Sequence, residues 1–398
     1  MTGLGDDPRL GGRRWQSAMV AIVCLVGVGA AALADDAGAR AEAVRQLREA
    51  YRGGPASWPA PAVDKDVAWK ELGLLPGVNH PPENQPNAST TELGRLLFFD
   101  HRLSASGQIA CASCHEPSMG WTDGRATGMT RGPPPHRNTP TIENTVFHTS
   151  FAWDGRAASL EEKTRESLTS ATELDSSPEV AVRLITACAE YRELYAEAFP
   201  GRAVEGEGVV DAIAAFERSV VGGKSRFDAF LRGNAAALSD AEIIGLDLFR
   251  RRAGCMNCHH GPLLSDGGFH DLGMSYYGRR SEDLGKFAVT GKPSDVGRFR
   301  TPSLRNVTRT EPLTHTGLFE VPGLINMYDA GMPVLRRRAH QRDDPLFPVK
   351  SSHLRPLGLS PEDRADLAAF LGALEEPKES ARHPDLPSLD TPPIVSGR

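Results

Sequence analysis

Two copies of one short motif carry the clearest chemistry in this sequence. Each copy reads C-x-x-C-H, from Cys111 to His115 and from Cys255 to His259. Two thiols on one helical turn can add to the two vinyl groups of a porphyrin, and the adjacent imidazole then reaches the iron as proximal ligand. This spacing is the attachment signature of c-type haem. The residues predicted to bind two covalent haems are Cys111, Cys114, His115, Cys255, Cys258 and His259.

Two other chemistries also use paired cysteines. A structural zinc site needs four ligands in one cluster, but these pairs lie far apart in the chain and each has its own histidine. A disulfide within C-x-x-C is usually redox-active and not structural. Both alternatives are less favoured than haem. Cys188 lies in a helical pattern and is expected to be a small buried hydrophobic residue.

Further motifs occur in a fixed order around the two haem motifs. Together they resemble the bacterial di-haem cytochrome c peroxidase superfamily, which includes the MauG enzymes of methylamine utilisation, over about residues 90–375. The resemblance implies that the N-terminal haem meets peroxide and that the C-terminal haem handles electron transfer. The motifs are L-F-F-D at Leu97, R-N-T-P-T at Arg137, W-D-G-R at Trp153, F-H-D-L-G at Phe269 and R-T-P-S-L-R-N at Arg300.

The resemblance assigns roles to individual residues. His115 corresponds to the proximal ligand of the peroxide haem, and His259 to that of the second haem. Glu173 falls at the distal acid–base carboxylate, a group that can take a proton from bound peroxide and return it to the far oxygen. Trp153 falls at the tryptophan between the haems.

The resemblance also implies a calcium ion between the domains. Asn138, Thr310 and Pro312 match the positions that hold it, partly through carbonyl oxygens. Three neutral oxygen donors would leave water to complete the coordination shell.

The sequence departs from the family pattern in the first haem pocket. The glutamine common ten residues before the acid–base glutamate is Lys163 here. The histidine that ligates the first haem until reduction in many members has no counterpart near residues 129–130. His136 is close by, but it is more typical of a loop residue. We therefore expect a first haem that is open to peroxide in the ferric state.

The sixth ligand of the second haem is a choice between neighbours. Aligned on its closing helix, the family position is Tyr328, as in MauG-like members, and a slip of one residue would make it Met327. Adjacent side chains on a helix point about 100° apart, so only one can face the iron. A thioether favours Fe(II), whereas a phenolate favours higher oxidation states.

The elements that must position these residues are mainly helices. Capping boxes, Ser89 with Glu92 and Ser239 with Glu242, precede two similar apolar helices that lead to the haem motifs. This similarity indicates an internal duplication. A single helical face is predicted from Ser177 through Tyr195, and strand-like alternation is scarce.

The sequence thus predicts a mainly α, loop-rich protein with two cytochrome c-like domains that each bind one c-type haem. The expected segments are a signal peptide (1–34), a Pro-rich arm (35–88), an N-terminal domain with the peroxidatic haem (89–235), a C-terminal domain with the electron-transfer haem (236–375) and a tail (376–398).

Composition and the leader indicate where the protein works. The 398 residues are 40% hydrophobic, which argues against disorder, and the net charge of −6 without any basic run excludes a nucleic-acid partner. Arg13 and Arg14 precede an apolar stretch that ends at an A-x-A site at Ala34. That stretch is shorter than the ~20 residues of a membrane span. We expect a cleaved signal peptide, periplasmic localisation and no membrane span after cleavage; an uncleaved N-terminal anchor is the alternative.

Three functions fit these observations. The first is a peroxidase that reduces hydrogen peroxide with electrons from a small c-type cytochrome or cupredoxin. The second is a MauG-like enzyme that oxidises tryptophan or tyrosine residues of a partner protein. The third is a non-catalytic di-haem electron carrier. Glu173 disfavours the carrier, and Tyr328 favours the MauG-like enzyme over a conventional peroxidase with a Met-ligated second haem.

Overall fold

The computed structural model describes residues 38–129, 137–378 and 382–390. The chain forms two compact units, which divide after Arg52. Residues 38–52 belong to the first unit and are helical over 38–50. The second unit starts at Gly53 and contains both haem motifs. The predicted signal peptide lies outside the described residues.

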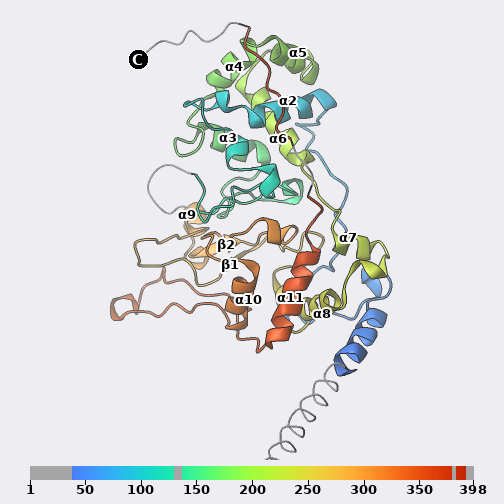
Figure 1. The fold of residues 1–398 in the computed structure, drawn as a ribbon. Helices are drawn as coiled ribbons and strands as arrows, with labels where there is room; N and C mark the ends of the chain where they lie inside the picture. Colours follow the sequence, from blue (N-terminus) through green and yellow to red (C-terminus); the bar gives the residue numbers. More distant parts are fainter. Residues whose placement is uncertain (1–37, 130–136, 379–381, 391–398) are drawn as a thin grey trace, which may run out of the picture. The chain divides into compact units, whose positions relative to one another are not determined.

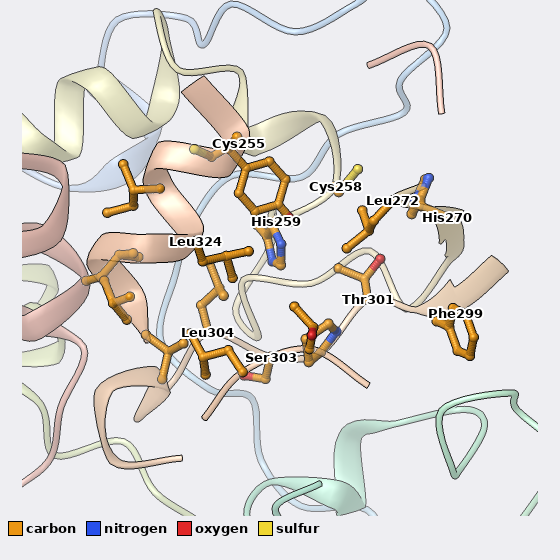
Figure 2. Close-up of a pocket in the computed structure, with 18 of the residues that line it drawn as sticks. Cys255, Cys258, His259, His270, Leu272, Phe299, Thr301, Ser303, Leu304 and Leu324 are labelled. Carbon is orange, nitrogen blue, oxygen red and sulfur yellow. The ribbon is translucent and has the colours of Figure 1, made fainter. Parts of the chain in front are cut away.

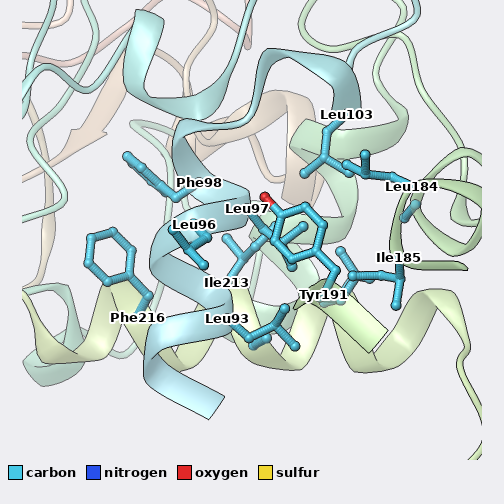
Figure 3. Packing of buried hydrophobic residues seen from close by; sticks show 14 of the residues in the cluster. Leu93, Leu96, Leu97, Phe98, Leu103, Leu184, Ile185, Tyr191, Ile213 and Phe216 are labelled. Carbon is cyan, nitrogen blue, oxygen red and sulfur yellow. The ribbon is translucent and has the colours of Figure 1, made fainter. Parts of the chain in front are cut away.

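Five helices surround the first haem motif. Their apolar faces form one core, in which Leu97 of α2, Ile213 of α6 and Tyr191 of α5 are almost fully buried (Figure 3). The helices are α2 (Ala88–Phe99), α3 (Leu160–Thr169), α4 (Pro178–Thr186), α5 (Ala189–Ala198) and α6 (Gly206–Ser219) (Figure 1).

The second haem motif lies among a separate group of elements (Figure 1). Strands β1 and β2 pair antiparallel, with His270 opposite Phe299. The elements are α7 (Arg226–Leu231), α8 (Asp240–Arg250), β1 (Phe269–Asp271), α9 (Phe287–Thr290), β2 (Arg298–Arg300), α10 (Val321–Asp329) and α11 (Pro361–Ala373).

The same close helix crossing occurs in both groups. A Cβ atom on Gly94 of α2 would lie 1.8 Å from the backbone oxygen of Ala212 in α6. A Cβ atom on Gly245 of α8 would lie 2.0 Å from the backbone oxygen of Asp366 in α11. The helix that precedes each haem motif, α2 or α8, therefore needs glycine where it crosses its partner helix. This shared requirement is the physical reason for the similar sequences of the two helices.

The Pro-rich segment after Gly53 packs beside the second haem motif. The backbone N–H of Ala62 donates to the oxygen of Arg250 (3.0 Å), and the N–H of Gly261 donates to the oxygen of Lys70 (3.0 Å). Arg250 is fully buried and forms an ion pair with Glu71. This segment is therefore an integral part of the fold around the second motif.

Two local predictions were wrong. The N-cap of α2 is Asn87, whose side chain accepts from the N–H of Thr90, and not Ser89. The helix predicted through Tyr195 is broken, because α4 ends at Thr186 and α5 begins at Ala189, with the extended residue Cys188 before it. The capping box of Ser239 with Glu242 is confirmed.

The mainly helical, loop-rich class is confirmed. The division into two cytochrome c-like domains remains a prediction; α7, placed before the predicted boundary, packs on α11 through Phe227 and Phe370. Within the described ranges, no helix has the length and apolar character needed to span a bilayer.

Candidate functional site

The first haem motif opens into a cavity of about 450 Å³. Cys111, Cys114 and His115 line it, and so do Lys163 and Glu173. The fold thus brings the predicted acid–base carboxylate, from the turn after α3, into the same space as the first attachment motif.

The second motif opens into a more apolar cavity of about 200 Å³. Figure 2 shows Cys255, Cys258 and His259 facing this space together with leucine side chains such as Leu304 and Leu324. Such a lining suits the face of a flat apolar cofactor, with a few polar groups fixing its orientation.

Both motifs have the same local geometry. Each runs through a single tight turn, and the N–H of the histidine donates to the oxygen of the first cysteine, at 3.0 Å for His115 and 2.8 Å for His259. Burial raises the pKa of the thiols of Cys111 and Cys255, so they are neutral. No disulfide joins the cysteines of the described ranges.

The hydrogen bonds and the burial of the two motif histidines suit them to ligate a metal. Nδ1 of His115 lies 3.0 Å from the backbone oxygen of Trp121, and Nδ1 of His259 lies 2.9 Å from that of Leu264. A carbonyl oxygen only accepts, so each Nδ1 carries the hydrogen and each Nε2 keeps a lone pair. Burial lowers the pKa of both histidines, which also favours the neutral ligand form. Such an outer hydrogen bond is typical of a ligating histidine.

The zinc alternative receives little support from the geometry. In the described part of the chain, one group of three possible ligands converges, Cys258, Asp266 and His270, with ligand atoms within 4.8 Å of one another. It includes neither Cys255 nor His259. The Asp266 carboxylate is already bonded to His270 Nε2 at 2.7 Å.

Trp153 lies in the wall that the two cavities share. It lines both cavities and is 7% exposed. Its indole Nε1–H donates to the backbone oxygen of Asn138 (2.8 Å), and its own backbone oxygen accepts from the N–H of Arg300 (2.8 Å). These bonds fix the indole between the sites, where the resemblance places it.

The shared wall also contains Arg300, the first residue of the R-T-P-S-L-R-N motif, and His148; the sequence analysis gave neither a role of its own. Arg300 is buried, and burial lowers its pKa to about 10. Its Nε–H donates to the backbone oxygen of Ala152 (3.3 Å), and it has no carboxylate partner among the described residues. Its Nη1 lies 3.4 Å from Nδ1 of His148, which must accept because a guanidinium only donates. Burial, with Arg300 as a smaller cause, lowers the pKa of His148 to about 3, and its Nε2–H is buried with no partner within the described ranges.

These two groups provide a test of whether haem fits the site. A buried cation and a buried donor each need an acceptor. A haem carries two propionate carboxylates that would supply such acceptors from either cavity. The residues therefore fit the group. Nothing local in the sequence links His148 to Arg300, so sequence reasoning had no signal for this pair.

Glu173 is held in a charged environment. Burial is the largest influence and raises its pKa, but the Lys163 ammonium, a hydrogen bond from Ser167 and the charge of Arg156 together lower the pKa below its ordinary value. Lys163 Nζ lies 3.5 Å from Glu173 Oε1. Glu173 is therefore a carboxylate at neutral pH.

Glu217 of α6 is a second carboxylate in the first cavity, and the sequence analysis missed it. Burial raises its pKa to about 7, against the lowering effect of Lys163. The hydroxyl of Thr164 donates to its Oε2 at 3.3 Å. Glu217 could have been found from the sequence, because it lies next to the apolar helix face that contains Ile213 and Phe216.

The second cavity distinguishes the two candidate ligands on α10. Tyr328 lines the cavity together with His259. Burial raises the pKa of its phenol. Met327 is not among the described residues that line this space; its backbone oxygen accepts from the N–H of Met332 (2.8 Å).

Two of the three predicted calcium ligands, Asn138 and Thr310, line the second cavity. The N–H of Asn138 donates to the backbone oxygen of His315 (2.9 Å). The side-chain N–H of Asn138 donates to the oxygen of Arg125 (2.8 Å), so its Oδ1 is the atom that a cation would use. Pro312 lies in the same loop, between Thr310 and His315.

Comparison with known proteins agrees with this geometry. The sequence profile of the di-haem cytochrome c peroxidase family matches residues 88–236. The methylamine utilisation protein MauG of Methylorubrum extorquens is 35% identical over 78% of this chain and 85% of its own length. The cytochrome-c peroxidase IdrP1 of Pseudomonas sp. (strain SCT) is 32% identical over 80% of this chain and 89% of its own. A crystal structure of a MauG-like protein associated with microbial copper homeostasis superimposes with a TM-score of 0.69 at 30% identity, over 79% of this chain and 96% of that one.

Proposed function

Because this chain belongs to the di-haem cytochrome c peroxidase family, we propose that it is a MauG-like di-haem peroxidase in which Tyr328 ligates the second iron. As a member of the family it is an oxidoreductase that acts on hydrogen peroxide, and family membership implies two c-type haems. An enzyme of this family is not a mere electron carrier, which removes the third possibility.

The chain's own residues would hold the cofactors as follows. The thiols of each C-x-x-C pair would bind one haem covalently, and His115 and His259 would each ligate an iron through Nε2. Bound haem supplies an iron that can accept peroxide and be oxidised by it. Glu173 takes the proton of a ligand in the first cavity, and Trp153 holds a π-system between the two sites.

The proposal rests on one observation above all: Tyr328, and not Met327, lines the second cavity with His259. A phenolate is a hard anionic donor that stabilises the higher oxidation states of iron. With such a ligand the second site would store oxidising equivalents, and a MauG-like enzyme would pass them to a protein substrate.

Ferric spectra of two variants test the ligand assignment. Tyr328→Phe should change the coordination and lower the stability of the ferric form of the second haem, and Met327→Leu should leave its spectrum unchanged. Both variants should keep peroxide access at the first haem. The ferric charge-transfer band typical of thioether ligation, lost in Met327→Leu and kept in Tyr328→Phe, would return the protein to the conventional peroxidases.

That conventional peroxidase, with a Met-ligated second haem, is the second candidate function. The observation in its favour is that Met327 and Tyr328 are adjacent on α10, so that a rotation of this short helix would exchange them. Electrons would then come from a small c-type cytochrome or cupredoxin, and no protein substrate would be oxidised.

We further infer that the mature protein is periplasmic and holds calcium at Asn138, Thr310 and Pro312. Covalent haem attachment takes place outside the cytoplasm, in agreement with the leader at 1–34. The protein from the periplasmic fraction should have the mass of residues 35–398 plus two haems, and should contain one calcium ion. A longer chain, or a preparation without calcium that keeps its native haem spectra, would contradict the respective inference.

A further inference from the structure

Lys163 reaches into the first cavity from the inner face of α3. Its Nζ lies 2.7 Å from the hydroxyl oxygen of Ser167, 3.5 Å from Oε1 of Glu173 and 3.8 Å from Oε2 of Glu166. Arg156 already binds Glu166 at 2.6 Å. The nearest carboxylate to the ammonium is therefore Glu173, the group that faces the haem site.

The charges around this pair come from four elements. Arg156 precedes α3 and lines the cavity, and it pairs with Glu166 of α3. Glu217 of α6 also lines the cavity, and His115 belongs to the attachment motif. Burial favours the neutral form of both cavity carboxylates, Glu173 and Glu217. The Lys163 ammonium is the first cause that opposes burial at either carboxylate.

We propose that Lys163 is a positioning residue that holds Glu173 as an ionised base, ready to accept the proton of a weakly acidic ligand such as hydrogen peroxide in the first cavity. This inference rests on the proposed function, since it requires a haem in that cavity. The family resemblance implies a neutral glutamine at this position, which could orient the carboxylate but could not keep it charged. The lysine therefore makes the base available at lower pH than burial alone would allow.

The proton balance of the step is simple. An acidic ligand H–X gives its proton to the Glu173 carboxylate, which becomes a carboxylic acid, while X⁻ stays in the cavity. The Lys163 ammonium keeps its own proton throughout. Ser167 accepts from Lys163 and fixes the direction of the ammonium.

Cyanide is a suitable probe, because HCN must lose its proton on binding and no redox chemistry follows. We would measure the association rate of cyanide with the ferric di-haem protein, by its spectral change, from pH 3 to 9. The wild-type rate should fall at low pH with a midpoint set by Glu173. Lys163→Met should move this midpoint upward by about one pH unit or more, the usual effect of removing an opposite charge at this distance.

Matched variants identify the groups involved. Lys163→Arg keeps a cation and should keep the wild-type midpoint within about half a unit. Glu173→Gln should abolish the acid limb, and Glu217→Gln should retain it. If Lys163→Met does not yield folded protein with two haems, Lys163→Gln serves as the neutral variant.

The possible outcomes separate the inference from the proposed function. A wild-type protein without a cyanide-dependent spectral change would overturn the proposed open first haem and, with it, this inference. Cyanide binding with the same pH midpoint in wild type and Lys163→Met would overturn the inference alone. An acid limb that disappears in Glu217→Gln and persists in Glu173→Gln would assign the base to the other carboxylate.

Discussion

At the scale of single residues, the first cavity combines a neutral imidazole with a charged base. Burial keeps His115 neutral and outweighs the bond to the Trp121 oxygen, which raises its pKa. Lys163, Ser167 and Arg156 keep Glu173 ionised. One pocket thus holds a neutral histidine and an ionised glutamate, because the two side chains have different neighbours. Such matched environments are typical of acid–base catalysis at neutral pH.

The first prediction concerns Glu173. Glu173→Gln should slow the reaction of the ferric protein with hydrogen peroxide by about 10²–10⁴-fold, because a positioned acid–base group contributes a factor of this size. Stopped-flow absorbance of the haem bands gives the rate. Glu179→Gln, at an exposed position at the start of α4, serves as the control and should react as wild type. Equal rates for wild type and Glu173→Gln would remove Glu173 from the catalytic role.

At the scale of elements, each attachment motif follows a helix that crosses a partner helix closely. Gly94 and Gly245 occupy equivalent places in these two crossings. Because the atom that a methyl group would meet is a backbone oxygen, the partner helix must move as a whole. Overpacking of this kind is destabilising.

Alanine substitutions test the two crossings. Gly94→Ala and Gly245→Ala should each lower the free energy of unfolding by about 1–3 kcal/mol or more, the usual cost of overpacking. Gly372→Ala in α11 is the control, because its Cβ would meet no atom within 4 Å. That variant should be neutral or stabilised by up to about 1 kcal/mol through helix propensity. Denaturant unfolding would measure all three, and unchanged stability of Gly94→Ala would contradict the tight crossing.

The elements also show what sequence can and cannot reveal. The capping box at Ser239 is a local pattern, and it was predicted correctly. The two C-x-x-C-H motifs are local patterns as well, and each forms a single tight turn. The break between α4 and α5 has a distant cause. Asp390 accepts from the N–H of Ala189 at 2.8 Å and donates its own N–H to the oxygen of Ala187 at 3.0 Å. A partner two hundred residues away leaves no mark in the local pattern.

The candidate site also contains residues that the sequence could reveal and contacts that it could not. Glu173, Trp153 and Tyr328 were placed through motifs that lie close to them in sequence, and the structure brings them to the two cavities. The contact of Arg300 with His148 depends on how the two halves of the fold meet. Only the folded chain shows that a buried cation faces both sites.

At the scale of the whole molecule, charged groups join the parts of the chain that carry the two motifs. Arg137 binds Asp154 at 2.5 Å and Asp283 at 2.7 Å, and these two carboxylates are far apart in the sequence. Glu143 accepts from the side-chain N–H groups of Asn306 at 2.7 and 2.9 Å. These contacts hold the wall that contains Trp153.

Glu143 leads to a prediction about pH. Burial, followed by the nearby Glu376 carboxylate, raises its pKa from 4.5 to about 7, while Arg305 and Arg309 act in the opposite direction. The folded state then binds more protons than the unfolded state between these values. The contribution of Glu143 to stability is therefore greatest below pH 4.5, and it is lost as the pH rises through 7. The loss attributable to Glu143 is up to about 3 kcal/mol.

The variant Glu143→Gln should reduce that pH dependence. Free energies of unfolding measured from pH 4.5 to 8 should fall less steeply for the variant than for wild type, and the two proteins should differ most above pH 7. The exposed variant Glu179→Gln should follow the wild-type curve through the same range. Parallel curves for wild type and Glu143→Gln would show that this carboxyl does not titrate as its surroundings indicate.

The Pro-rich segment beside the second motif has a consequence for how the protein is made. Ala62 and Lys70 are translated early, but their hydrogen-bond partners, Arg250 and Gly261, are translated much later. Segments that appear first usually fold first, yet this one must wait for a distant part of the chain. Its hydrogen bonds can form only after the second attachment motif has been synthesised. This Pro-rich segment is therefore among the last parts of the chain to fold, and its docking marks the end of assembly at the second motif.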